Sequence, residues 1–117
     1  MKQNNELIRF ILIRAESETA PTFSITAREI LSEFPEINQD ILDEHIRILV
    51  ETGFLEAQPT QLYWIIQRLT PAGHNFLQNA SDPAVWKKTL QVAGQFTLDV
   101  IARILTEVAV KSALRSL

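Results

Sequence analysis

The chain of 117 residues contains no cysteine, only three glycines and one methionine, and no long apolar run. Without cysteine there is neither a disulfide framework nor thiolate chemistry. A membrane-spanning helix needs roughly 18 apolar residues in succession, and the N-terminal MKQNNEL lacks the apolar segment of a signal peptide. The remaining composition, 46% hydrophobic and 21% charged, is that of an ordinary globular chain. We therefore expect one cytoplasmic domain.

The charges are distributed unevenly, although the net charge is only −3. Residues 16–56 hold ten acids and two bases, whereas residues 57–117 hold six bases and three acids. Because an electric field acts through local patches, the acidic segment has two interpretations. It is either an ordinary solvated surface or a binding surface for a basic partner.

The first half of the chain predicts three helices. Apolar residues at helical spacing mark a helix over residues 5–15. A capping box starts a second helix over residues 27–34, and a proline ends it. Asn38 then caps a third helix, which continues to the left-handed cap expected at Gly53. A three-residue turn between the second and third helices predicts a helix-turn-helix.

The second half of the chain begins with a predicted β-hairpin. Residues 54–57 and 62–68 are rich in aromatic and β-branched residues and flank a turn that contains proline. Three further helices are expected after Thr70, Asp82 and Thr97. This order predicts a mainly α chain with a small β-hairpin (α+β), a winged helix-turn-helix with a C-terminal helical extension.

Three short motifs strengthen this prediction. The segment IRILVETGFL at residues 46–55 resembles the recognition helix and first wing strand of winged-helix transcriptional regulators. The segment LTPAGHNFL at residues 69–77 resembles the helix after the wing, and DPAVW follows at residues 82–86. Together they resemble an uncharacterised bacterial and prophage family of small winged-helix proteins, catalogued as a domain of unknown function. The resemblance implies a fold and a bacterial or phage setting, but no activity.

The third helix carries the candidate binding face. Opposite its apolar stripe lie four acids and one base, and such a surface repels the phosphates of DNA. Ile48 either flanks the core or anchors a protein partner. We therefore predict a regulatory or interaction module that binds a protein with a basic surface through Asp40, Asp43, Glu44, Arg47, Ile48 and Glu51. The alternative is a DNA-binding transcriptional regulator that acts as a dimer and contacts DNA through Arg47, Arg68, Lys87 and Lys88.

The last helix predicts self-association. We expect one structural domain, with the winged core over residues 1–80 and the helical extension over residues 81–117. The final helix is apolar nearly all round, and such a helix is normally buried. We predict a two-fold homodimer, whereas the alternative is a helix packed entirely within its own chain. The candidate interface residues are Leu98, Ile101, Ile104, Leu105 and Val108.

Nothing in the sequence indicates catalysis. The two histidines, His45 and His74, lack the spacing of a metal pair, and we expect each to pack or to form hydrogen bonds. Asp43 and Glu44 are adjacent, so on a helix they point roughly 100° apart and cannot share a site. Trp64 either packs in the core or presents an aromatic ring for binding. We predict a non-enzymatic protein with no cofactor and no metal site.

Overall fold

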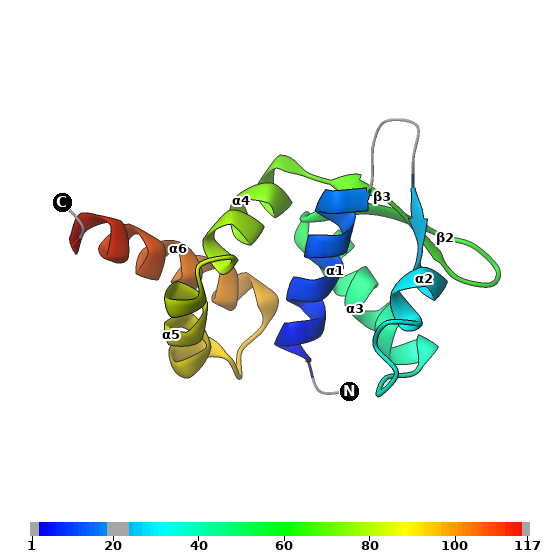
Figure 1. The fold of residues 1–117 in the computed structure, drawn as a ribbon, viewed down its shortest axis with the longest axis horizontal. Coiled ribbons are helices and arrows are strands. Elements are labelled where there is room, and N and C mark those ends of the chain that lie inside the picture. The colour runs from blue at the N-terminus through cyan, green and yellow to red at the C-terminus, as the bar shows by residue number, and fades with distance from the viewer. Residues whose placement is uncertain (1–2, 19–23, 116–117) are drawn as a thin grey trace. The chain divides into compact units, whose positions relative to one another are not determined.

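The computed structural model describes residues 3–18 and 24–115. Their fold is mainly helical with a small three-stranded antiparallel sheet (Figure 1). The elements follow in the order α1 (Asn5–Glu18), β1 (Ile25–Thr26), α2 (Ala27–Leu31), α3 (Gln39–Thr52), β2 (Leu55–Pro59), β3 (Trp64–Leu69), α4 (Pro71–Ala80), α5 (Pro83–Ala93) and α6 (Leu98–Arg115).

Helix α1 is longer than the sequence pattern predicted, because it ends at Glu18 rather than at residue 15. Its first turn is capped by Asn4, whose side-chain oxygen accepts a hydrogen bond from the Leu7 amide at 3.1 Å. Its last turn holds an ion pair of 2.5 Å between Arg14 and Glu18, four residues apart. The apolar face of the helix is fully buried and consists of Leu7, Ile8, Ile11, Leu12 and Ala15.

Helix α2 is shorter than predicted. The Glu29 carboxylate accepts a hydrogen bond from the Thr26 amide at 3.2 Å, as a capping box requires. The helix ends at Leu31, and residues 32–38 connect it to α3. The expected three-residue turn is therefore wrong. The residue before Pro35 is pushed out of helical geometry, and the chain continues in turns instead.

Helix α3 agrees with the prediction at both ends. Asn38 accepts a hydrogen bond from the Ile41 amide at 2.9 Å, and Gly53 adopts a left-handed φ of 88°. The buried side of the helix consists of Leu42, His45, Ile46 and Leu49.

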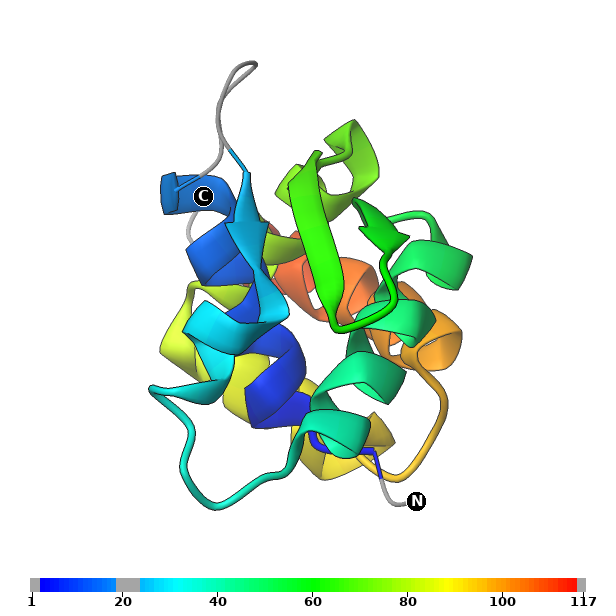
Figure 2. The same cartoon turned by 90° about the vertical axis from the view of Figure 1, so that its right-hand side faces the viewer.

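The predicted hairpin is confirmed as β2 and β3, which pair in antiparallel register from Leu55↔Leu69 to Pro59↔Trp64. Strand β1, which the sequence did not predict, pairs with the other edge of β3. Figure 2 shows β3 between the two shorter strands. The sheet order β1-β3-β2 therefore ties the segment before α2 to the hairpin that follows α3.

The chain divides into two compact units, residues 1–74 and residues 75–117, and the boundary falls within α4. In the first unit, Thr70 caps α4 by accepting a hydrogen bond from the Gly73 amide and donates to the Gly53 carbonyl at 2.6 Å. In the second unit, Asp82 caps α5 through the Ala84 amide at 2.9 Å. Helices α5 and α6 pack against each other in this second unit.

Candidate functional site: the charged surface of α3 and the hairpin

The six residues of the predicted partner-binding face all lie on α3, away from its buried stripe. Three of them, Asp40, Arg47 and Glu51, are exposed, and the other three, Asp43, Glu44 and Ile48, are half-buried. We call this surface the α3 face. Acids outnumber bases on it by four to one.

The single base of the α3 face is occupied by its own neighbours. The Arg47 guanidinium donates to Glu51 at 2.8 Å, one turn ahead, and also pairs with Glu44, one turn behind. These are the i,i+4 and i,i+3 positions, at which opposite charges on a helix meet. The α3 face therefore presents no unpaired cation to an approaching phosphate.

Asp43 differs from the other acids of the α3 face. One of its carboxylate oxygens is buried and has no hydrogen-bond partner among the described residues. Burial raises the pKa of Asp43, the neighbouring Asp40 raises it further, and a hydrogen bond from Gln39 opposes both. Asp43 is therefore not an ordinary exposed charge.

The second candidate DNA contact, Arg68, lies on β3 and is also paired. The register of the hairpin places Glu56 of β2 directly opposite it. The guanidinium and the carboxylate form two hydrogen bonds, of 2.6 and 2.8 Å. The pairing lowers the pKa of Glu56 and raises that of Arg68.

The turn of the hairpin is joined to the start of α3. The Gln39 side chain donates a hydrogen bond to the Leu62 carbonyl, while the Leu62 side chain is 74% exposed. Thr60 closes the turn with a hydrogen bond of 2.5 Å to the Tyr63 carbonyl. Trp64, at the start of β3, is half-buried. The Gln39 hydrogen bond thus holds the hairpin turn against the first turn of α3.

The remaining two DNA-contact candidates, Lys87 and Lys88, lie in the second unit. Both are exposed on α5. The structure therefore does not assemble the four candidate bases into one patch within a unit, because Arg47 and Arg68 belong to residues 1–74.

His45 is fully buried and forms two hydrogen bonds. Its Nε2 accepts from the Asn4 amide at 2.8 Å, and its Nδ1 lies 2.7 Å from the Ile41 carbonyl. A backbone amide can only donate, so the ring proton must reside on Nδ1. The other histidine, His74, is exposed, and its Nδ1 lies 3.4 Å from the Glu16 carboxylate. The prediction that these histidines form hydrogen bonds or pack is confirmed for His45.

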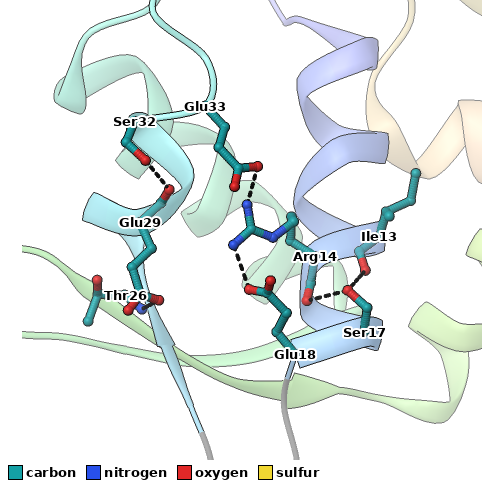
Figure 3. A network of polar contacts seen from close by, with 8 residues as sticks. All are labelled: Ile13, Arg14, Ser17, Glu18, Thr26, Glu29, Ser32 and Glu33. Atoms are coloured by element: carbon teal, nitrogen blue, oxygen red, sulfur yellow. Dashed lines mark hydrogen bonds and ion pairs between the residues drawn. The ribbon is translucent and has the colours of Figure 1, made fainter.

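Sequence reasoning missed a third paired arginine, Arg14, shown in Figure 3. Its side chain is only 13% exposed and lies between the carboxylates of Glu18 and Glu33, which raise its pKa. The spacing of Arg14 and Glu18 indicates the first pair, but Glu33 is remote in sequence. This arginine connects α1 to the segment after α2, and its charge is balanced by carboxylates of the same chain.

The candidate dimer residues on α6 do not share one environment. Leu98, Ile101 and Leu105 are buried within the chain itself, whereas Ile104 and Val108 are half-buried. The residues that a second copy could still cover are therefore Ile104 and Val108, and the homodimer stays a prediction. The chain covers the other three without help.

No group of three metal-ligating side chains occurs within residues 3–18 and 24–115. In the same part of the chain, no helix is both long enough and apolar enough to cross a bilayer. A family model described as a hypothetical protein, DUF2513, matches residues 2–99, which includes α1 to α5 and only the start of α6. Comparisons with curated proteins and with solved structures find no match.

Proposed function

The chain belongs to the DUF2513 family, and we propose that it is a non-enzymatic winged-helix module of bacterial or phage type. We propose further that it acts in regulation by binding a protein with a basic surface through the α3 face. The order α1-β1-α2-α3-β2-β3, with a hairpin directly after the third helix, supports a winged helix-turn-helix.

One observation carries the proposal for a protein partner: the bases of α3 and of the hairpin, Arg47 and Arg68, are already paired with carboxylates. Arg47 has two carboxylate partners and Arg68 has a bidentate one. Non-specific DNA affinity arises when Lys and Arg replace the counterions of the phosphates. Here a phosphate would have to displace carboxylates of the same helix at Arg47 and a carboxylate of the neighbouring strand at Arg68.

The net charge of the first unit supports the same conclusion. Residues 1–74 contain eleven acids and six bases, a net charge of −5. This negative charge attracts a basic protein surface and repels the phosphates of DNA. The field also steers association, so binding to such a partner is expected to weaken as salt is added.

The experiment uses two probes on the full chain. A labelled lysine-rich peptide should bind the full chain at low salt, as measured by fluorescence anisotropy. In an NMR titration with this peptide, the protein amide signals that shift should be those of α3. Asp40→Asn with Glu51→Gln should weaken this binding. Glu36→Gln serves as the control, because Glu36 is an exposed acid outside the α3 face.

The second probe is duplex DNA of random sequence. We expect no change in the electrophoretic mobility of this duplex at micromolar protein. Binding to the duplex that falls steeply with added salt, and that is lost in Arg47→Ala or Arg68→Ala, would contradict the proposal. It would favour the DNA-binding regulator, for which exposed Arg28 on α2 provides a base free of ion pairs within the described part of the chain.

A further inference from the structure

Helices α5 and α6 leave a groove between them on the second unit, with a volume of 410 Å³. Its floor is apolar. Val85 and Val92 contribute from α5, and Ile104 and Val108 contribute from α6. The Val92 side chain is 60% exposed, so the groove is open along one side. An exposed apolar groove rimmed by polar residues is a candidate site for a ligand or a partner.

The lining residues have the spacing of helix faces. On α5 they include Val85, Lys88 and Val92, and on α6 they include Ile104, Val108 and Arg115. Steps of three and four residues place these side chains along one side of each helix. The groove therefore runs along the two helix axes, over about 16 Å from residue 104 to residue 115 at 1.5 Å per residue. This is the shape that a third helix of about three turns fills.

The charges at the rim determine which helix fits. Three bases, Lys88, Lys111 and Arg115, line the groove together with one acid, Glu107. None of these bases forms an ion pair within residues 75–115. The rim therefore carries a net charge of +2 and attracts carboxylates.

A second copy of the chain fits this rim poorly. In a two-fold dimer through the groove, each rim meets the identical rim of the other copy. Two surfaces of the same sign would then face each other at close range, and like charges in an interface are unfavourable. The charge of the rim thus favours an acidic partner over self-association.

We propose that the groove between α5 and α6 binds an acidic amphipathic helix of a partner protein. The apolar residues of that helix lie on the valine and isoleucine floor, and carboxylates along its flanks pair with Lys88, Lys111 and Arg115. This site is separate from the α3 face, since it lies in the other unit and selects the opposite charge.

The test compares two synthetic helical peptides that share one leucine stripe, flanked by glutamates in one and by lysines in the other. Anisotropy on the full chain should show about tenfold tighter binding of the glutamate peptide, a difference of roughly 1.4 kcal/mol. Added salt should reduce the difference in affinity between the two peptides.

Four variants of the full chain locate the site. The double variant Lys88→Glu with Lys111→Glu should lose the preference for the glutamate peptide. Val108→Asp should lower the affinity for both peptides. The controls lie beside the groove but do not line it. They are Lys87→Glu, with an exposed side chain on α5, and Val110→Asp, with a side chain on α6 that is 52% exposed. Neither control should change binding by more than about twofold, as for surface changes generally.

Two results would overturn the proposal. Equal affinity for the two peptides, or equal losses in the control and groove variants, would show that the groove does not select an acidic helix. Light scattering that gives twice the chain mass, together with dissociation in Val108→Asp, would show that a second copy fills the groove. The exposed lysine variants keep the test valid if Val108→Asp does not fold. Binding of the lysine-rich peptide at the α3 face is measured separately, so each proposal can fail alone.

Discussion

Replacement of buried His45 by leucine should destabilise the fold by leaving a donor without its partner. The ring accepts a hydrogen bond from the Asn4 amide at 2.8 Å, just before α1 begins. Leucine fills a similar volume but has no acceptor. The Ile41 carbonyl is less affected, because the α3 backbone supplies its usual helical partner.

The magnitude follows from the burial of the two partners. A buried donor that loses its acceptor costs about 1–3 kcal/mol. The Asn4 residue is half-buried, so water reaches it in part, and we expect His45→Leu to cost about 1–2 kcal/mol. For a chain of this length, each kcal/mol lowers Tm by roughly 4 °C.

Urea denaturation and thermal melting of three proteins test this reasoning. His45→Gln retains a side-chain oxygen that can accept from the Asn4 amide, so it should recover part of the stability that His45→Leu loses. Amide hydrogen exchange at Asn4 should accelerate in His45→Leu alone. If His45→Leu matches the wild type, or if His45→Gln is no more stable than His45→Leu, the hydrogen bond contributes nothing.

Two further predictions concern stability. Because burial raises the pKa of Asp43 above 3.8, folding favours its protonated form, and stability falls as pH rises from 3.8 to the folded-state pKa. Asp43→Asn should therefore be more stable than the wild type at pH 7, and urea melts should show this gain disappearing below pH 3.8. In Gly73→Ala the new Cβ would overlap the Phe54 carbonyl, so a loss of about 1–3 kcal/mol or more is expected. In Gly53→Ala only the positive φ opposes the substitution, at about 1 kcal/mol, and thermal melts should rank the two alanine variants accordingly.

The features that the sequence predicted correctly act over a few residues. Asn38, Gly53 and Asp82 end or begin helices through hydrogen bonds or backbone angles that their own neighbours complete. Such signals remain valid whatever the rest of the chain does. The cap at Asn4 is equally local, but MKQNNEL has several polar residues in a row, and nothing in that segment distinguishes the capping one.

The features that the sequence did not predict depend on remote partners. Strand β1 has two residues and exists only because β3 pairs with it. The burial of α6 depends on packing within the chain, which the pattern of one helix does not contain. At the candidate site, sequence spacing alone indicates that Arg47 pairs with Glu44 and Glu51. The pairing of Arg68 with Glu56 can be predicted only from the register of the hairpin, and that register is irregular next to Glu56.

The pairing of bases differs between the two units, and this difference predicts where any anion binds. In the first unit, Arg14, Arg47 and Arg68 are held by carboxylates of their own chain, and of the bases discussed only Arg28 is free of ion pairs among the described residues. In the second unit, Lys87 and Lys88 are exposed and form no ion pair within residues 75–115. An anion gains more at an unpaired base, because it displaces only water and counterions. We therefore expect heparin at very low salt to shift amide signals of α5 and α6 in NMR titrations. Shifts confined to α3 and the hairpin would show that the paired arginines exchange their partners readily, and would remove the main argument against DNA recognition by α3.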